Sequence, residues 1–271
     1  MEHPQEKNLD EISSSPTIED ENQDSFLENE DVSNVLNEPY KVLARKYRPQ
    51  NFSDLLGQEV MVDILSNAFR SGRLAHAYML TGVRGIGKTT TARLLARALN
   101  YATNEVDQPT IDITEYGIHC KEIMESRHID VLEMDAASRT GIADIREIID
   151  SVSYSTTSAR YKIYIIDEVH MLSKSAFNGL LKTLEEPPKN TVILIISHDI
   201  QKIPKTIISR CTTIKFNCLK KQEVKEYCDI NKIDSTNFDL EKNYELYGGS
   251  IEKLLFFVNG NGVKLINQLK E

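Results

Sequence analysis

The sequence has few cysteines and no long apolar run, and both shortages narrow the class of protein. No purely apolar run exceeds Val192–Ile196, which is far too short to span a bilayer. The start of the chain also lacks the basic-then-apolar pattern of a signal peptide. None of the cysteines forms a CxxC pair, which favours free thiols in a reducing compartment. We therefore expect a soluble, cytoplasmic protein without a membrane partner. The four cysteines are Cys120, Cys211, Cys218 and Cys228.

Negative charge is concentrated at one end of the chain. Residues 1–38 hold twelve acidic side chains and one basic side chain, a net charge of −11, so the chain's total of −9 leaves +2 for residues 39–271. With few large apolar side chains, segment 1–38 cannot offset its ordering entropy, and we expect a disordered acidic tail. The tail is either a solvated extension or an arm that binds a partner or mimics DNA. The near-neutral remainder leaves nucleic acid open as a partner.

Short apolar runs alternate with helical segments from about residue 42 onward. The runs suit strands buried on both faces of a parallel sheet, and the alternation predicts an α/β fold with helices flanking that sheet. The expected strands are 77–80, 131–134, 163–166 and 192–196, and the expected helices are 89–99, 142–151 and 174–184. Helical periodicity also appears at Val60, Ile64, Leu65 and Ala68. Beyond Cys211 the strand pattern gives way to helices, so we expect one domain at 39–213 and a small helical lid domain at 214–271.

A glycine-rich loop between an expected strand and an expected helix carries the strongest functional signal. Its residues 82–89 read Gly-Val-Arg-Gly-Ile-Gly-Lys-Thr. Glycines let backbone N–H groups surround a polyphosphate, Lys88 reaches the phosphates, and the Thr89 hydroxyl is placed to ligate Mg²⁺. The alternative is a plain glycine-rich turn. The residues expected to contact the nucleotide here are Gly82, Gly85, Gly87, Lys88, Thr89 and Thr90.

Two further features complete a candidate nucleotide-hydrolysing site. Asp167 and Glu168 follow a buried strand, at the end where ligands of α/β sheets bind. Asp167 is suited to hold Mg²⁺, and Glu168 to polarise the attacking water; the alternative is a merely solvated strand end. Arg210 is the planar donor that suits a transferring phosphoryl group, although its spacing alone favours a surface arginine at the start of a helix or strand.

With these residues the chain resembles the gamma/tau subunit of bacterial DNA polymerase III, a clamp loader of the AAA+ ATPases. The resemblance is dense from about Val42 to Phe216. It rests on Val42–Pro49, Phe52, Leu56-Gly57-Gln58, His76-Ala77-Tyr78, Gly82–Thr89, Asp135–Gly141, Asp167–Leu172, Leu180–Pro188 and Ser209-Arg210-Cys211.

The resemblance implies an AAA+ P-loop ATPase that uses ATP and Mg²⁺. Such subunits form a hetero-oligomeric ring with other clamp-loader subunits, close on the sliding clamp and hydrolyse ATP when primer–template DNA binds. By this resemblance Lys88 and Thr89 bind phosphate and Mg²⁺, and Asp167 and Glu168 are the metal-binding and water-activating acids. Arg210 becomes an arginine finger that acts on ATP held by a neighbouring subunit.

The resemblance also assigns residues around the base and the DNA. Arg48 and Pro49, with Gly57-Gln58, would flank the adenine. The segment Ser138-Arg139-Thr140 would face the DNA backbone, where binding is electrostatic; a capped turn before the helix at 142–151 explains the same residues. Members of the family are grouped with DNA-directed DNA polymerases, which are nucleotidyltransferases. Nothing in this sequence resembles a polymerase palm with spaced aspartates, so we expect no nucleotidyl transfer by this chain.

Three departures from the family pattern matter. The family's four-cysteine zinc module keeps only Cys120 here, and one thiolate cannot close a tetrahedral site, so we expect no zinc there. Ser197-His198 replaces a threonine pair, and His198 matches the residue that senses the γ-phosphate, unless the two are a plain polar strand end. Glu252 stands where the family has a phosphate-binding arginine, and Lys253 would point about 100° away on a helix.

These departures keep an alternative function open. A non-hydrolysing stator subunit, similar to delta-prime, would bind nucleotide weakly and donate Arg210 to a neighbour. Glu252, the pair Ser197-His198 and the lack of a collar domain after the lid favour it, whereas the intact glycine-rich loop and acidic strand favour the ATPase. ATP binding distinguishes the two.

Overall fold

The computed structural model describes residues 47–138, 155–236 and 238–258, all within one unit that spans residues 42–271. The acidic segment 1–38, the expected helix at 142–151 and the pair Arg139-Thr140 lie outside the described residues. Within the described ranges, every helix is too short or too polar to serve as a membrane span.

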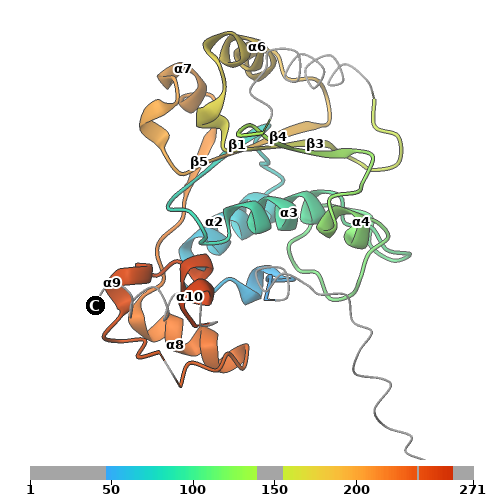
Figure 1. Ribbon diagram of the computed structural model, residues 1–271. Coiled ribbons are helices and arrows are strands. Elements are labelled where there is room, and N and C mark those ends of the chain that lie inside the picture. Colours follow the sequence, from blue (N-terminus) through green and yellow to red (C-terminus); the bar gives the residue numbers. More distant parts are fainter. Residues whose placement is uncertain (1–46, 139–154, 237, 259–271) are drawn as a thin grey trace, which may run out of the picture. The chain divides into compact units, whose positions relative to one another are not determined.

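Five parallel strands form one sheet in the order β2-β3-β4-β1-β5 (Figure 1). Every residue of β1 and β4 is buried, which explains their apolar composition: a strand covered on both faces has no polar side. The α/β fold with a parallel central sheet and flanking helices is therefore confirmed. The strands are β1 (Ala77–Thr81), β2 (Val131–Asp135), β3 (Lys162–Asp167), β4 (Thr191–Ser197) and β5 (Thr212–Lys215).

The strand β5 is a correction to the sequence analysis, which expected only helices beyond Cys211. It lies at the edge of the sheet and pairs in parallel with β1, with Thr212 opposite Tyr78. Of its four residues only Ile214 is buried. An edge strand with one buried position leaves no apolar run in the sequence, so the sequence pattern could not indicate it. The strand also continues past residue 213, where we expected the domain boundary.

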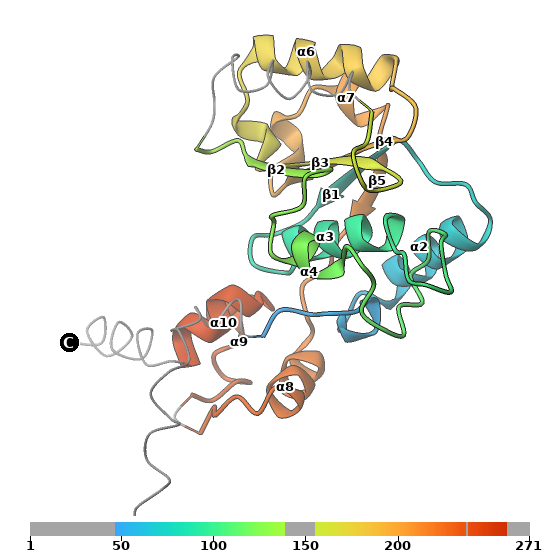
Figure 2. The same cartoon turned by 90° about the vertical axis from the view of Figure 1, so that its right-hand side faces the viewer.

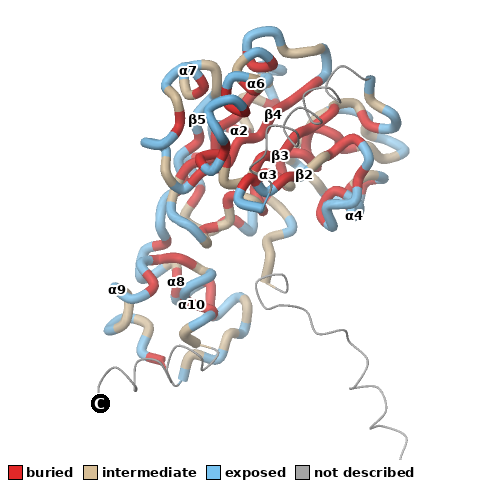
Figure 3. The backbone as a smooth tube through the Cα atoms, turned by 45° about the horizontal axis from the view of Figure 1, so that its top comes forward, coloured by how far each residue is buried: buried red, intermediate tan, exposed pale blue. Residues whose placement is uncertain are grey.

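Helices cover both faces of the sheet (Figures 1 and 2). Alternate residues of β1 separate the two layers: Tyr78 and Leu80 pack with α2, α3 and α4, whereas Ala77 and Met79 pack with α6 and α7. Figure 3 shows the resulting band of buried backbone through the strands. These helices are α2 (Glu59–Arg70), α3 (Lys88–Leu99), α4 (Cys120–Met124), α6 (Lys174–Glu185) and α7 (Lys205–Ile208), joined by the 3₁₀ turns η1 (Phe52–Asp54), η2 (Val169–Met171) and η3 (Ile200–Lys202).

Helix α2 exists as its periodicity predicted, but it turns a different face to the core. Met61, Leu65 and Phe69 are buried at a spacing of four residues, which places them on one side of a helix. Val60 and Ile64 are 72% and 57% exposed. The apolar stripe is wider than the buried one, so the sequence pattern alone could not fix the rotation of the helix.

Three helices after β5 build a second apolar cluster. They are α8 (Lys221–Ile230), α9 (Tyr244–Tyr247) and α10 (Ile251–Val258), and their buried residues include Val224, Tyr227 and Leu254. The Ser250 hydroxyl, just before α10, donates a 3.0 Å hydrogen bond to the carbonyl of Arg84 in the glycine-rich loop. These helices therefore pack directly against the loop that carries the candidate chemistry.

Candidate functional site

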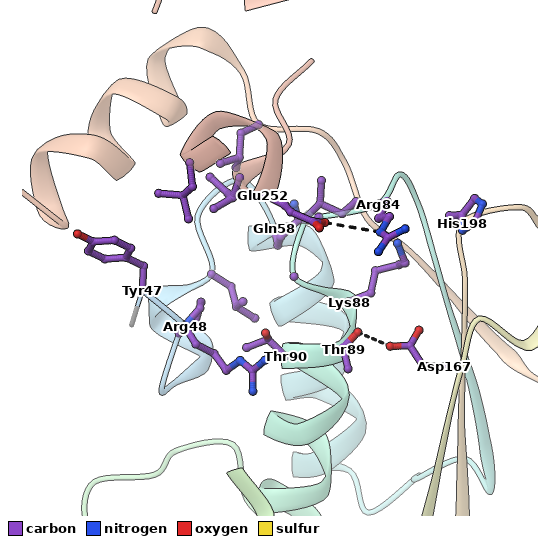
Figure 4. A pocket seen from close by; sticks show the side chains of 18 of the residues that line it. Tyr47, Arg48, Gln58, Arg84, Lys88, Thr89, Thr90, Asp167, His198 and Glu252 are labelled. Carbon is purple, nitrogen blue, oxygen red and sulfur yellow. Dashed lines mark hydrogen bonds and ion pairs between the residues drawn. The ribbon is translucent and has the colours of Figure 1, made fainter. Parts of the chain in front are cut away.

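A cavity of about 580 Å³ opens at the carboxyl ends of the central strands. Thr89 lines it from the start of α3, Asp135 from the end of β2, Asp167 from the end of β3 and His198 from just after β4. Figure 4 shows Lys88, Thr89 and Asp167 gathered on one side of this cavity, with Glu252 approaching from α10. A volume of this size suits a nucleotide-sized ligand.

The loop from Gly82 to Gly87 is shaped by glycine. Gly87, immediately before α3, has φ 95°, a conformation that side chains disfavour. Gly85 has φ 79°, and a Cβ there would lie 2.5 Å from the Glu252 Cβ. Among the described residues no side chain caps the N-terminus of α3. Its N–H groups and the positive end of its dipole therefore remain available to an anion.

Lys88 is held inside this loop. Its Nζ donates hydrogen bonds of 2.8 Å and 2.7 Å to the carbonyls of Gly82 and Val83. Burial lowers the pKa of Lys88, while the nearby carboxylates of Glu168, Asp167 and Glu252 act in the opposite direction. The ammonium group is thus poorly solvated, and within the described ranges its hydrogen bonds go to loop carbonyls, which suits a group that exchanges these bonds for phosphate oxygens.

Thr89 and Asp167 meet across the floor of the cavity. The Thr89 hydroxyl donates a 2.7 Å hydrogen bond to Asp167 Oδ2. Burial raises the pKa of Asp167, although the Thr89 hydroxyl and the N–H of Glu168 lower it in part. A half-buried carboxylate beside a hydroxyl is an oxygen donor pair that suits Mg²⁺, so the residues present fit the ion that the fold implies.

Glu168 contacts two histidines rather than facing the cavity freely. Its backbone is left-handed, with φ 50°, an unusual conformation outside glycine that clusters at functional sites. Glu168 Oε2 accepts a 2.8 Å hydrogen bond from His198 Nδ1 and lies 3.4 Å from His170 Nδ1. Burial lowers the pKa of His170, and the neighbouring His198 lowers it further.

The opposite wall of the cavity contains the residues expected around the base. Arg48 and Pro49 line it beside Tyr47. Arg48 Nε is one of two buried side-chain nitrogen or oxygen atoms without a hydrogen-bond partner in the described part of the chain. A buried donor without a partner is costly, so this atom points to a ligand. Gln58 also lines the cavity, and its side-chain amide donates a 2.8 Å hydrogen bond to the Asn217 carbonyl.

Sequence reasoning missed the apolar part of this wall. Leu219, Tyr227 and Leu255 line the cavity from the helical part of the chain. All three are buried: Leu219 lies just before α8, Tyr227 on α8 and Leu255 on α10, and buried apolar residues of this kind look like ordinary core positions. Only the fold, which brings α8 and α10 over the loop, identifies them as cavity residues.

Arg210 and Ser138 lie apart from this chemistry. In the described part of the chain Arg210 is not among the residues that line the cavity. Its guanidinium donates to the Thr206 carbonyl at 2.7 Å and pairs with Glu185 at 2.8 Å. The Ser138 hydroxyl donates to the Asp135 carbonyl at 3.0 Å. The first arrangement permits action outside this chain's own cavity, and the second is a local turn that involves only Ser138 of the segment expected to face DNA.

The positions that differ from the family pattern lie at the cavity or next to residues that line it. Of the described residues, Glu252 lines the cavity and Lys253 does not, as their spacing on a helix implies. Glu252 Oε2 lies 3.8 Å from Arg84 Nε, and both side chains are more than half exposed. Ser197 is fully buried and bonds His170 at 3.1 Å, whereas His198 is exposed at the cavity.

Cys120, the remaining position of the cysteine module, is buried at the start of α4. Its sulfur accepts hydrogen bonds from Arg97 Nε at 3.0 Å and from the Gly117 N–H at 3.2 Å. These contacts give the thiol a packing role between α3 and the preceding loop. The expectation that no zinc binds there remains a prediction.

The parallel sheet, the glycine-rich loop and the acidic end of β3 define an AAA+ P-loop NTPase fold. The Holliday junction branch migration motor RuvB of Thermotoga maritima has a similar fold: its TM-score is 0.53 at 17% identity, over 79% of this chain and 64% of that chain. At this identity the likeness concerns the fold alone.

A family model described as DNA polymerase III, delta subunit, matches residues 57–220. The gamma subunit of Buchnera aphidicola subsp. Acyrthosiphon pisum is 44% identical over 220 residues, 80% of this chain and 60% of that protein. The tau subunit of Escherichia coli K12 is 47% identical over 188 residues, 69% of this chain and 28% of that protein. The chain therefore belongs to this family of DNA polymerase III subunits, and it corresponds to the N-terminal region of gamma/tau.

The chain spans 60% and 28% of the lengths of these two curated relatives. Similarity over part of a protein identifies the family and the fold of the shared region. The activity and partners of the whole relatives do not follow from it and need their own argument.

Proposed function

We propose that this chain is an ATP-binding and ATP-hydrolysing clamp-loader subunit of bacterial DNA polymerase III. One observation carries the proposal: the Thr89 hydroxyl of the glycine-rich loop lies 2.7 Å from the carboxylate of Asp167 at the end of β3. The proposed phosphate-binding loop and the proposed metal-binding carboxylate of Asp167 thus line one cavity of about 580 Å³. The family places this chemistry in DNA replication, which in bacteria occurs in the cytoplasm.

In this proposal the triphosphate lies over the loop, contacted by its backbone N–H groups, Lys88 and Thr90. Thr89 and Asp167 would hold Mg²⁺, which supplies positive charge against the phosphates. Lys88 exchanges its two carbonyl partners for phosphate oxygens. Arg48 and Pro49 would flank the adenine, whose apolar faces suit the wall formed by Leu219, Tyr227 and Leu255.

Glu168 acts as the general base of the hydrolysis. Its carboxylate takes a proton from the attacking water as the water oxygen bonds the terminal phosphorus. The bond from that phosphorus to the bridging oxygen breaks, so that ADP leaves and inorganic phosphate is formed. His198 bonds Oε2 of this carboxylate, so either that bond opens or the other oxygen accepts the proton. His198 is also the residue placed to sense the terminal phosphate, since it lines the same cavity.

Arg210 acts in a neighbouring subunit. It lies outside the set of described residues that line this chain's cavity, and within the described part of the chain its guanidinium pairs with Glu185 at 2.8 Å. Both side chains are partly exposed, so the pair opens at low cost. We therefore propose that the chain joins a hetero-oligomeric ring with other clamp-loader subunits, with the sliding clamp and primer–template DNA as its partners. We also propose the division into domains at 39–213 and 214–271, with β5 continuing across that boundary to Lys215.

The alternative, a non-hydrolysing stator subunit, is not favoured. The curated relatives above are named gamma and tau, and the proposed catalytic residues Lys88, Asp167 and Glu168 all line one cavity. Of the features that favour the stator, Glu252 lines that cavity, but its side chain is more than half exposed and therefore screened.

Hydrolysis by the assembled loader tests the proposal. The full chain should bind Mg-ATP, and with partner subunits, clamp and primed DNA it should hydrolyse it. Glu168→Gln should keep binding and lower the hydrolysis rate by about 10²–10⁴-fold, the usual contribution of a general base. Glu226→Gln, an exposed change on α8, is the matched control and should alter neither quantity. A folded chain that does not bind ATP would refute the function, and an unchanged rate in Glu168→Gln would refute the base.

A further inference from the structure

Three metal-binding side chains converge beside the cavity. Glu168, His170 and His198 each offer one donor atom, and these atoms lie within 4.8 Å of one another, the one such group of three found among the described residues. Glu168 and His170 follow β3, and His198 follows β4. Because β3 and β4 are neighbouring parallel strands, the segments after them meet at the same edge of the sheet.

The donors are nearly in place for a single ion. Glu168 Oε2 lies 2.8 Å from His198 Nδ1 and 3.4 Å from His170 Nδ1. Donors around a tetrahedral ion at Zn–N and Zn–O distances of about 2.1 Å stand about 3.4 Å apart. The His rings are 4.2 Å apart and nearly perpendicular, so both edges reach the same carboxylate without stacking.

The exposure of the three ligands differs. The His170 side chain is 2% exposed and that of Glu168 is 21% exposed, whereas that of His198 is 41% exposed. Packing therefore constrains His170 most, and His198 is the ligand that an entering ion reaches from solvent.

The chemistry of the donors selects the ion. Imidazole nitrogen favours Zn²⁺, Cu²⁺, Ni²⁺ and Co²⁺, whereas Mg²⁺ requires oxygen ligands. The hydroxyl of Thr89 and the carboxylate of Asp167 form an oxygen pair for Mg²⁺ close by. The carboxylate of Glu168 and the two imidazoles form a ligand set that suits a transition-metal ion. A transition-metal ion and Mg²⁺ therefore do not compete for the same ligands.

We propose that Glu168, His170 and His198 form an inhibitory site for a divalent transition-metal ion, such as Zn²⁺. The bound ion occupies the carboxylate of Glu168 and prevents it from accepting a proton. Inhibition of hydrolysis rests on the proposed function, whereas metal binding itself does not. This site is separate from the cysteine module, of which Cys120 remains.

Binding is tested with Co²⁺ on the full chain in excess Mg²⁺. Visible absorption should report one Co²⁺ bound without a thiolate charge-transfer band, and Zn²⁺ should displace it. His198→Thr, at an exposed position, should weaken binding at least tenfold, and His198→Asn provides a second variant at the same site. His119→Gln is the matched control, because His119 also bonds another histidine, His128, at 2.9 Å, and it should bind Co²⁺ as the unaltered chain does.

Equal binding by the unaltered chain and His198→Thr would overturn the proposal, and so would a thiolate band or the absence of saturable binding. In the assembled loader, Zn²⁺ should reduce ATP hydrolysis over the concentration range that fills the site, and a zinc-selective chelator should restore it. His198→Thr, compared with its own metal-free rate, should require at least tenfold more Zn²⁺. If no ATP is hydrolysed at all, the proposed function fails, but the Co²⁺ titration still decides the metal site.

Discussion

Replacing Lys88 by methionine should weaken nucleotide binding without lowering the stability of the nucleotide-free chain. The substitution keeps the apolar stem of this buried side chain and removes the ammonium group. That group donates two hydrogen bonds, at 2.8 Å and 2.7 Å, to carbonyls of its own loop. In the proposed complex it turns to phosphate oxygens instead. Removing the ammonium group therefore costs loop hydrogen bonds in the nucleotide-free chain and phosphate contacts in the complex, and the two losses are measured separately.

The loss of affinity follows from the bonds that the ammonium makes to phosphate. A hydrogen bond to a charged group contributes about 1.5–3 kcal/mol, and each 1.4 kcal/mol is about a factor of ten in Kd. Lys88→Met should therefore weaken Mg-ATP binding by about 10–150-fold. Binding to the full chain is measured by titration calorimetry, with Lys225→Met on the exposed side of α8 as the control.

The stability without nucleotide should not fall in the same variant. Burial lowers the pKa of Lys88, which means that the folded chain holds this ammonium in a less favourable environment than water does. The two carbonyls that it leaves belong to Gly82, which is partly exposed, and Val83, which is 47% exposed, so water replaces the lost donor. The free energy of unfolding in urea should stay equal or rise, as expected where a functional group is held against stability.

Two results would refute this reasoning. An affinity for Mg-ATP within about threefold of the unaltered chain would mean that Lys88 makes no bond worth 1 kcal/mol to the phosphates. A clear loss of stability without nucleotide would mean that its bonds to Gly82 and Val83 organise the loop. Nucleotide-induced stabilisation gives an independent check, because ligand bound only to the folded chain raises stability with its concentration, and Lys88→Met should lose that rise.

Three further predictions concern charges at defined positions. Asp130, just before β2, is buried and accepts hydrogen bonds from the N–H groups of Thr157, Ser158 and Ala159. Asp130→Ala should lower the free energy of unfolding in urea by about 2–4 kcal/mol, since these groups lose a charged acceptor, and a loss below about 1 kcal/mol would contradict this. Glu252→Gln should tighten Mg-ATP binding about two- to fivefold at low salt and less at high salt, as for an exposed, screened charge; weaker binding would contradict it. Arg210→Ala should leave Mg-ATP binding to the isolated chain unchanged and lower hydrolysis by the assembled loader about 10³-fold; equal rates would exclude a finger role.

The Asp130 prediction has a pH dependence of known sign. Burial raises the pKa of Asp130, but N–H groups of Ala159, Ser158 and Thr157 outweigh it, and the pKa lies below its usual range. A carboxyl whose folded pKa is depressed stabilises the fold above its unfolded pKa and loses that contribution as the pH falls through the folded pKa. The stability difference between Asp130→Ala and the unaltered chain should therefore shrink below about pH 4. Asp63→Asn, an exposed change on α2, is the control.

Strands buried on both faces were predictable because burial leaves a run of apolar letters. The residues of β1 and β4 are all buried, and the expected ranges agree with the observed strands. β5 was not predictable in this way, since an edge strand needs only one buried side chain, Ile214. The loop before α3 was predictable for another reason: its glycines satisfy a backbone requirement, which leaves a signature whatever surrounds it.

The candidate site was predictable only where one local segment supplies the chemistry. Lys88 and Thr89 belong to one loop, and Asp167 and Glu168 to one strand end. The wall that includes Leu219 and Tyr227 comes from another layer of the fold, and its residues have the pattern of core positions. A wall assembled from distant apolar residues has no spacing of its own, so the sequence could not indicate it.

The pairing of Glu168 with His198 depends on the order of the strands. The sequence marked Ser197-His198 as a polar pair placed to sense phosphate, but its partner could not be read from spacing, since thirty residues separate His198 from Glu168. The order β3-β4 within the sheet makes them neighbours, and the left-handed turn at Glu168 brings its carboxylate back to that edge. With a strand between β3 and β4, the two ends would stand about 9–10 Å apart rather than about 4.8 Å, and neither the hydrogen bond nor a shared metal ion could form. Strand order therefore decides whether this histidine lines the cavity alone or also contacts the carboxylate of Glu168, the proposed base.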